Sequence, residues 1–190
     1  MYQKYQTDAL VLKSSEMGEA DKMFALYTRD FGLVHARASA VRKERSRMRY
    51  ALQNYARAEV ALVRGKRGWR LAGASARNDA AGAADAIRSF ARISELALRL
   101  IQGEEKNEYL FAALAEAHGA LMSPACSACP TIEIVCVARV LYALGYISAE
   151  ALETTLFVHT AYGDPELTEA ERLKDALLLS INRAIAETQL

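Results

Sequence analysis

The sequence has 190 residues, of which 52% are hydrophobic and 25% are charged. This composition can build a hydrophobic core, which excludes collagen-like, low-complexity and disordered chains, and the length allows one large domain or two small ones. The net charge of +1 is unevenly divided, because residues 1–78 carry 16 Lys and Arg against 7 Asp and Glu, whereas residues 79–190 carry 8 against 16. A basic half followed by an acidic half is typical of a polyanion-binding module joined to a different module.

The front half is predicted to hold five strands and one short helix. Short apolar runs separated by turn residues indicate the strands. The predicted strands are Thr7–Ser14, Asp21–Arg29, Leu33–Val41, Tyr55–Val63 and Trp69–Ser75. A short helix over Met48–Gln53 stands between the third strand and the fourth. Three strands, a helix and two more strands is the order of the five-stranded OB barrel, so an OB-fold nucleic-acid-binding domain is predicted for residues 1–78.

From Asp79 onward the composition changes to Ala, Leu and Glu, and an all-α domain is predicted for residues 79–190. The fold class is therefore α+β, with the domain boundary expected at Ala80–Ala83. Apolar residues at helical spacing predict helices over Ala84–Gln102 and after Asn107, which can cap the second helix.

Three more helices are expected after residue 128. Pro130 suits the first turn of a helix over Thr131–Gly145, which is apolar nearly all round and should be central. Ser148 can cap a short helix that ends near Phe157. The pattern Thr168-x-x-Glu171 is a capping box and is expected to open the last helix.

Two cationic loops of the predicted barrel form the candidate nucleic-acid site. The first loop and the end of the preceding strand supply Arg37, Arg42, Lys43, Arg45, Arg47 and Arg49, and the second supplies Arg64, Lys66 and Arg67. Clustered cations bind a phosphate backbone and release its counterions, and the loop between strands four and five of an OB fold flanks the ligand face. The alternative is a pair of solvated basic loops, but a half-chain of net charge +9 favours nucleic acid.

Aromatic residues near these cations are candidates for stacking on bases. Tyr50 is the best candidate because Arg49 precedes it directly and Arg47 lies close by. Trp69 is a second candidate, but its alternation with Leu71 and Gly73 favours a place in the core.

The remaining motifs point away from catalysis and from metal. The sequence contains no P-loop, dinucleotide fingerprint, nucleophile elbow or zinc-protease helix, so no catalytic residue and no cofactor is expected. Cys126-x-x-Cys129 is half of a zinc site without a second pair, so no metal is expected. Three cysteines, no signal-peptide pattern and no membrane span indicate a cytoplasmic chain with no membrane partner.

The residues of the front half resemble the RecO family of DNA-repair recombination mediators. The resemblance lies in Thr7–Ser14, Gly18–Lys22, Leu26–Leu33, Ala36-Arg37, Arg42-Lys43, Ser46-Arg47, Ala51–Gln53 and Val60–Gly65, and it returns at Arg139–Tyr146. Many members carry four zinc-binding cysteines after this last segment. No cysteine follows it here, so the chain resembles a short form without the zinc module.

The resemblance implies binding and annealing of single- and double-stranded DNA, with RecR as a partner. It also implies help in exchanging single-stranded-DNA-binding protein for RecA, and a site on the helical domain for the acidic C-terminal tail of that protein. Arg139 and Tyr142 are the candidate residues for the tail, with internal pairing of Arg139 to Glu133 or Glu95 as the alternative. Two other functions fit the composition, namely an RNA-binding or ribosome-associated OB-fold protein and a protein-interaction adaptor.

Overall fold

The computed structural model describes residues 3–77, 82–124 and 126–188. The chain divides into two compact units. Residues 1–79 with 102–111 form the barrel unit, and residues 80–101 with 112–190 form the helical unit. The segment 102–111 therefore differs from the sequence-based expectation, which assigned it to the helical domain. Residues 80 and 81 of the predicted boundary lie outside the described residues.

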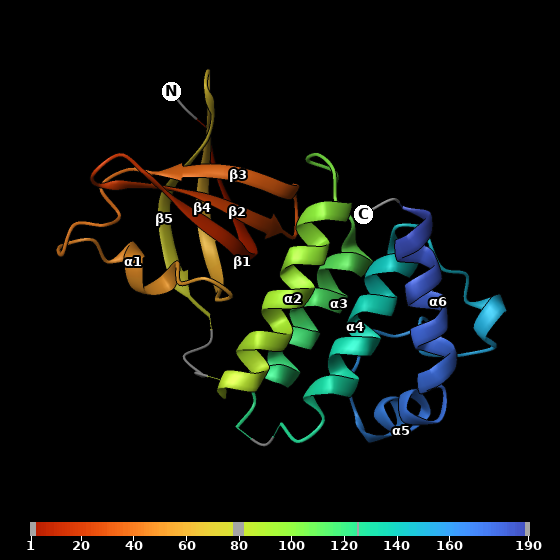
Figure 1. Cartoon of the computed structure of the whole chain (residues 1–190). Coiled ribbons are helices and arrows are strands. Elements are labelled where there is room, and N and C mark those ends of the chain that lie inside the picture. The colour runs from red at the N-terminus through yellow and green to blue at the C-terminus, as the bar shows by residue number, and fades with distance from the viewer. Residues whose placement is uncertain (1–2, 78–81, 125, 189–190) are drawn as a thin grey trace. The chain divides into compact units, whose positions relative to one another are not determined.

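Five strands and the short helix α1 build the barrel unit (Figure 1). The elements are β1 (Lys4–Met17), β2 (Asp21–Thr28), β3 (Gly32–Ala38), α1 (Met48–Ala51), β4 (Arg57–Gly65) and β5 (Gly68–Ala76). The strands close in the order β1-β2-β3-β5-β4, and every pair is antiparallel except β3 with β5. Closure gives every strand two neighbouring strands. The predicted OB-fold barrel followed by helices is confirmed.

Strand β1 pairs with two different strands along its length. Its first part, Lys4–Leu10, pairs with β4. Its second part, as far as Met17, pairs with β2, and the register shifts between Val11 and Lys13. The end of β1 therefore continues with β2 as a hairpin beyond the last residue that β4 pairs.

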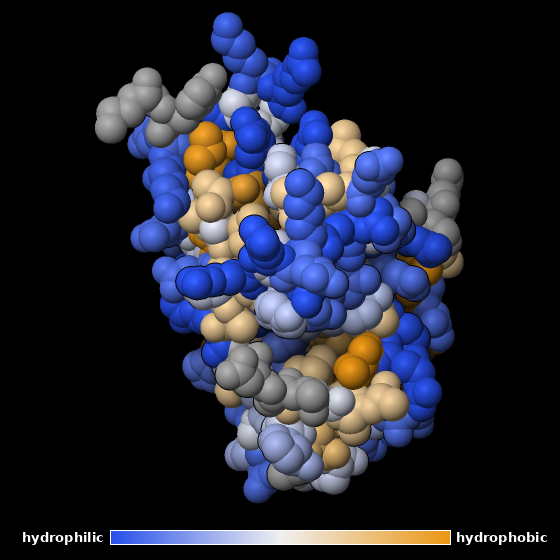
Figure 2. All heavy atoms as spheres, turned by 90° about the vertical axis from the view of Figure 1, so that its left-hand side faces the viewer, coloured by the Kyte–Doolittle hydropathy of each residue, from blue (hydrophilic) through white to orange (hydrophobic). Residues whose placement is uncertain are grey.

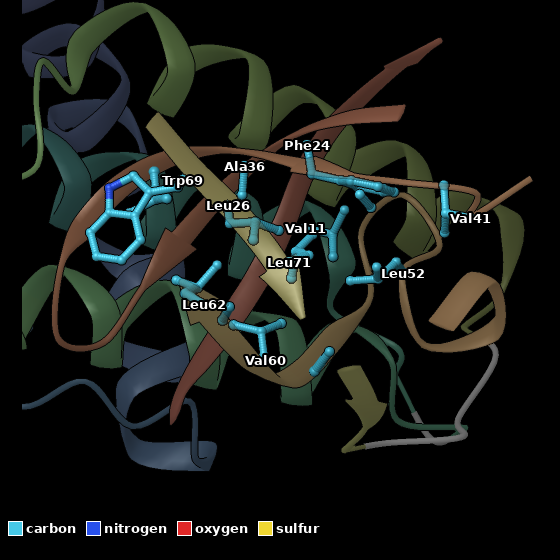
Figure 3. Packing of buried hydrophobic residues seen from close by; sticks show 14 residues of the cluster. Val11, Phe24, Leu26, Ala36, Val41, Leu52, Val60, Leu62, Trp69 and Leu71 are labelled. Atoms are coloured by element: carbon cyan, nitrogen blue, oxygen red, sulfur yellow. The ribbon is translucent and has the colours of Figure 1, made fainter. Parts of the chain in front are cut away.

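Alternate side chains of the strands fill the barrel (Figure 3). Val11, Phe24, Leu26, Val60 and Leu62 are each at most 1% exposed. Figure 3 shows Trp69 at one end of this cluster and Val41 with Leu52 at the other. The apolar side chains are removed from water from one end of the barrel to the other, and such burial is the main stabilising contribution of a core.

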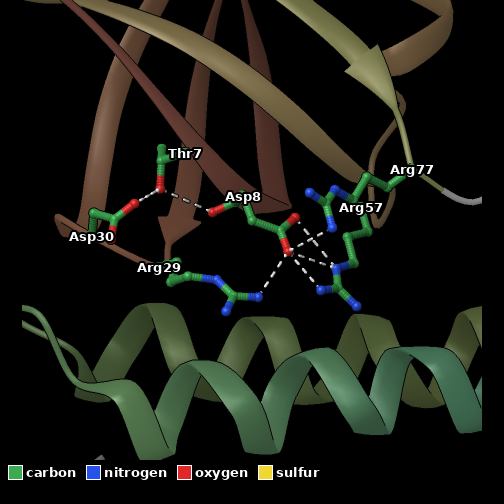
Figure 4. A network of polar contacts seen from close by, with 6 residues as sticks. All are labelled: Thr7, Asp8, Arg29, Asp30, Arg57 and Arg77. Atoms are coloured by element: carbon green, nitrogen blue, oxygen red, sulfur yellow. Dashed lines mark hydrogen bonds and ion pairs between the residues drawn. The ribbon is translucent and has the colours of Figure 1, made fainter.

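A buried carboxylate ties four strands of the barrel together (Figure 4). Asp8 of β1 accepts hydrogen bonds from Arg57 of β4, with Nη2 2.5 Å from Oδ2, and from Arg29 after β2 at 3.2 Å. Arg77 directly follows β5, and its Nη1 lies 3.9 Å from Asp8 Oδ2. Burial by itself would raise the pKa of Asp8, but Arg57, Arg29 and Arg77 outweigh it and hold the pKa below its usual value.

The segment 102–111 packs on the outside of the barrel. The ring of Phe111 stacks on Tyr27 with centroids 6.3 Å apart, and the guanidinium of Arg29 lies 4.9 Å from the Phe111 centroid. Gly32 has a φ of +63°, and a Cβ there would clash with the backbone of Glu105. Glycine is therefore required where this segment crosses the start of β3.

The helical unit is built around α4. Its elements are α2 (Ala84–Leu100), the later turns of α3 (Glu108–Leu121), α4 (Cys129–Ala143), the 3₁₀ turn η1 (Glu150–Leu152), α5 (Asp164–Arg172) and α6 (Lys174–Glu187). α4 packs against α2, α5 and α6, as its apolar pattern predicts. The predicted cap of α3 is also confirmed, because the backbone N–H of Leu110 donates to Asn107 Oδ1 at 2.9 Å.

Two expectations for the end of the chain are wrong. The helix predicted after Ser148 is only the turn η1, because the Ser148 hydroxyl donates to Glu150 Oε2 and does not cap a longer helix. The helix predicted to begin at Thr168 begins at Asp164, since Pro165 fits a first turn and Glu166 accepts the backbone N–H of Gly163 at 3.0 Å. A separate helix, α6, then follows.

No helix within residues 3–77, 82–124 and 126–188 combines the length and the apolar character that a membrane-crossing helix needs.

The Asp8 cluster leads to a prediction about stability. Asp8→Asn should lower the free energy of unfolding near neutral pH by about 2 kcal/mol, because the charge-assisted hydrogen bonds from Arg29 and Arg57 and the ion pair with Arg77 are weakened. The loss should shrink as the pH falls below the unfolded-state pKa of about 3.9, because a carboxyl whose folded pKa is lowered stabilises only when it is ionised. Urea unfolding at several pH values measures both effects.

The matched control is Glu59→Gln, because Glu59 is the exposed residue opposite Asp8 on β4. It should change stability by less than about 0.5 kcal/mol. An equal loss of unfolding free energy in the two variants would show that the contacts of Asp8 with the three arginines do not stabilise the barrel.

Candidate nucleic-acid interface

The hairpin formed by the end of β1 and the start of β2 has a hollow on each of its two faces. Successive side chains of a strand point to opposite faces. Ser14, Glu16, Lys22 and Phe24 line one hollow, whereas Met17 and Met23 line the other. The two hollows share no lining residue. We call them the inner hollow and the outer hollow, because Phe24 belongs to the barrel core and Met23 does not.

The outer hollow has a volume of about 630 Å³ and is the more basic of the two. Strands β2 and β3, the end of β1 and the β4–β5 loop form it, and this is the part of an OB fold that binds oligonucleotides. Its lining residues are Met17, Met23, His35, Arg37, Ser39, Val63, Gly65, Lys66, Arg67, Gly68, Trp69 and Arg70. Four of them are Arg or Lys, and none is acidic.

A carboxylate of the hairpin fixes one of these cations. Asp21 Oδ2 accepts from Arg37 Nε at 2.9 Å and from Nη2 at 2.5 Å, and Asp21 Oδ1 accepts the backbone N–H of Ala40 at 2.7 Å. These bonds, first that of Ala40 and then those of Arg37, hold the pKa of Asp21 below its usual value. Ala40 has a φ of 56°. Asp21 therefore stabilises a strained turn and positions a guanidinium whose side chain remains 48% exposed.

The inner hollow has a volume of about 610 Å³ and lies between the hairpin and the α1 segment. Its lining residues are Ser14, Glu16, Lys22, Phe24, Val41, Arg42, Arg49, Tyr50, Leu52, Gln53 and Asn54. Arg42 Nη1 forms an ion pair with Glu16 Oε2 at 3.1 Å and donates a hydrogen bond to the carbonyl of Gly18 at 3.2 Å. Two of the predicted cations and the predicted stacking residue Tyr50 therefore meet at one site.

The structure divides the nine predicted cations into three groups. Arg37, Lys66 and Arg67 line the outer hollow, and Arg42 and Arg49 line the inner one. The rest line neither hollow. Lys43, Arg45 and Arg47 are exposed on the segment that leads to α1, and Arg64 forms an ion pair with Glu104 at 3.4 Å. DNA binding by any of the nine remains a prediction.

Trp69 belongs to the core of the barrel, as its alternation with Leu71 along the strand indicates. It is 5% exposed and packs edge-on against Tyr5, with centroids 5.7 Å apart. The guanidinium of Arg64 lies 5.2 Å from its ring centroid. Neither face of this ring is free for a base, whereas Tyr50 is 65% exposed.

Figure 2 views the side of the barrel unit on which α1 lies in Figure 1. Hydrophilic side chains cover most of this surface, and smaller hydrophobic areas lie between them. A surface of this kind can hold phosphates with its cations and still offer apolar contact to bases.

Sequence reasoning missed three contributors to the two hollows. Arg70 lines the outer hollow because β5 pairs with β3, which puts Arg70 opposite Arg37. Lys22 and Gln53 line the inner hollow. The alternation that buries Trp69 already predicts that Arg70 points outward, but the pairing of β3 with β5 is needed to place it beside Arg37.

The expectation that Arg139 binds a partner's acidic tail is wrong. Arg139 is 0% exposed. Its guanidinium donates to the carbonyls of Leu156, Thr160 and Ala161 at 2.8 to 3.0 Å, and it lies 4.6 Å from the ring centroid of Tyr162. An incoming carboxylate has no access to it.

Among the residues that the structure describes, Arg139 also forms no ion pair with a carboxylate, which was the alternative expectation. Glu133 bonds to Arg92 at 2.6 Å, and the three carbonyls take the place of an acidic partner for Arg139. Tyr142, the second predicted tail residue, is half-buried and stacks on Phe157 with centroids 4.7 Å apart. Both residues thus hold the segment that follows η1.

The three cysteines lie among the described residues, and no disulfide joins any two of them. Cys136 is buried, and Cys126 and Cys129 are half-buried. Across residues 3–77, 82–124 and 126–188, no three His, Cys, Asp or Glu side chains are grouped so that they could hold a metal ion.

Comparison with known proteins gives a match in the front part of the chain. Residues 1–73 match the family described as Recombination protein O N terminal. The DNA repair protein RecO of Desulfitobacterium hafniense (strain DSM 10664 / DCB-2) is 44% identical over 62 residues, which are 33% of this chain and 23% of that protein. The protein of the same name from Pelotomaculum thermopropionicum is 42% identical over 62 residues, 33% and 24% of the two chains. The match thus spans about a quarter of these relatives' length.

The position of Arg139 yields a second prediction. Arg139→Met should lower the free energy of unfolding by about 3 kcal/mol, because it leaves the buried carbonyl of Leu156 and the partly buried carbonyls of Thr160 and Ala161 without their donor. Arg183→Met is the control, since the Arg183 side chain is 81% exposed, and it should change stability by less than about 0.5 kcal/mol. Urea unfolding measures both, and a fully stable Arg139→Met protein would contradict the structural role of Arg139.

Proposed function

We propose that this chain, whose residues 1–73 match the family described as Recombination protein O N terminal, is a non-enzymatic DNA-binding protein of the RecO family that acts in DNA repair and recombination. It binds single- and double-stranded DNA through the barrel unit and promotes the annealing of complementary strands. The chain's similarity to proteins named DNA repair protein RecO supports this role.

One observation carries the proposal, namely the outer hollow. It is of ligand size, it lies where OB folds bind oligonucleotides, and its charged lining is cationic. Lys66, Arg67 and Arg70 form no ion pair within the described residues, so their charges are available to phosphates. Contacts of this kind give affinity without sequence preference.

Annealing follows from the same chemistry in this proposal. Two complementary strands repel each other through their phosphates, and a cationic surface that releases counterions reduces this repulsion. The affinity must be moderate and salt-dependent so that the product duplex can leave.

The proposed partners are those of the family. The chain would act with RecR and assist the exchange of single-stranded-DNA-binding protein for RecA. Contact with the acidic tail of single-stranded-DNA-binding protein, if this chain makes it, uses cations other than the buried Arg139.

The test replaces Lys66, Arg67 and Arg70 together with Ala. DNA affinity should fall, and the slope of log affinity against log salt for a single strand should decrease by about 2, because each lost phosphate contact contributes about 0.7. A fluorescence-anisotropy titration with a labelled oligonucleotide at several salt concentrations measures the slope.

The control replaces the exposed helical-unit residues Arg88, Lys174 and Arg183 with Ala, which removes the same charge elsewhere. Its slope should equal that of the unchanged protein. A reduced slope in this control but not in the barrel variant would refute the proposed interface. Tighter binding to RNA than to DNA at one salt concentration would instead support the RNA-binding alternative.

A further inference from the structure

The inner hollow has a floor and a size that fit a flat organic ring. Phe24, Val41 and Leu52 are 1%, 2% and 3% exposed, and they form the apolar base of the hollow. The volume of about 610 Å³ lies in the range of sites that bind small organic groups. All lining residues belong to the barrel unit.

One wall of the hollow carries an aromatic ring that is held in place but left open. Tyr50 is 65% exposed, although large aromatic side chains usually bury most of their surface. The guanidinium of Arg49 lies 4.7 Å from its ring centroid, and Arg49 Nη2 donates to Tyr50 Oη at 2.6 Å. Arg49 therefore restrains the ring, which lowers the entropy cost of stacking on a ligand.

The same wall carries two amides with unused hydrogen-bonding capacity. Gln53 Nε2 donates to the carbonyl of Arg49 at 3.1 Å, and Asn54 Oδ1 accepts from Ser14 at 2.7 Å. Within the described residues, the Gln53 carbonyl oxygen and the Asn54 amino group make no further bond. An acceptor and a donor therefore remain, and the edge of a nucleobase presents the complementary groups.

The lining of the inner hollow also carries cations. Lys22, Arg42 and Arg49 line it, and Glu16 offsets only Arg42. A purely apolar ligand would leave these charges and the amides without partners. A small anion would not use the apolar floor. A ring with a polar edge that is linked to phosphates satisfies all three features.

We propose that the inner hollow binds one unpaired nucleobase of a single strand, which stacks on Tyr50 while Lys22 and Arg49 contact its neighbouring phosphates. The inference rests on the proposed binding of DNA by the outer hollow and adds a second subsite to it. A paired base cannot enter because its edge and both its faces are occupied in the duplex. The subsite therefore makes the barrel prefer single strands to duplexes of equal charge.

The decisive experiment compares an oligothymidylate with an abasic oligonucleotide of the same length. The two carry the same phosphates, so the outer hollow binds both. The oligothymidylate should bind about tenfold more tightly, since stacking of one base on an aromatic ring contributes about 1–3 kcal/mol. Equal affinities would overturn the base subsite and leave the proposed function intact. Failure of both to bind would overturn the proposed function as well.

Variants of Tyr50 assign the preference to this hollow. Tyr50→Ala should abolish the difference between the two oligonucleotides, and Tyr50→Phe, which keeps the ring, should retain it. Tyr146→Ala is the matched control, because Tyr146 is an exposed tyrosine of the helical unit, 44% exposed. Circular dichroism confirms that each variant is folded. Retention of the full preference by a folded Tyr50→Ala protein would overturn the proposal.

A competition arm distinguishes a base within a strand from a free nucleotide. Excess thymidine monophosphate should not displace the labelled oligothymidylate, because a free nucleotide lacks the phosphates that contact the outer hollow. Complete displacement would show that the hollow is a mononucleotide site, which contradicts the proposal.

Discussion

The candidate interface depends on one constraint, which is that strand β1 continues beyond its pairing with β4. The first part of β1 pairs with β4 and closes the barrel, while its end pairs with β2 alone. The register shift after Val11 marks the change of partner. The pairing of β1 with β4 ends at Leu10, and beyond it Ser14 and Glu16 line a hollow instead of the core. Both hollows exist because both faces of the hairpin remain accessible.

Acidic residues of the hairpin organise the basic surface. Asp21 fixes Arg37 on the outer side, and Glu16 fixes Arg42 on the inner side. Arg37 belongs to the end of β3, and Arg42 belongs to the stretch that joins β3 to α1. Asp21 also accepts the backbone N–H of Ala40, so both carboxylates connect this stretch to the hairpin. These ion pairs partly neutralise Arg37 and Arg42, but they also hold the two guanidinium groups in place beside the hollows. Within the described residues, Lys66, Arg67 and Arg70 form no ion pair and supply the remaining positive charge.

The sequence predicted the barrel well because the order of its strands and its helix is itself the signature of the fold. Trp69 was a candidate for stacking on bases, although its alternation with Leu71 and Gly73 favoured the place in the core that the structure shows. The sequence failed at Arg139, because the carbonyls that satisfy this guanidinium come from a segment with no periodic pattern. It also failed at Thr168, because both Thr168 and Asp164 are compatible with the first turn of a helix. The hydrogen bond from the Gly163 backbone N–H to the Glu166 carboxylate favours the earlier start. Arg70 and Gln53 required the tertiary arrangement, which no local pattern carries.

The central claim is that a nucleic-acid strand contacts both faces of the β1–β2 hairpin. Nuclear magnetic resonance of the ¹⁵N-labelled chain, titrated with a short oligothymidylate, tests it most directly. Amide signals of residues 14–24, 49–54 and 64–70 should shift together at one stoichiometry, whereas those around Asp8 and in α5 and α6 should stay in place. Shifts concentrated in the helical unit, with the hairpin unchanged, would contradict the account.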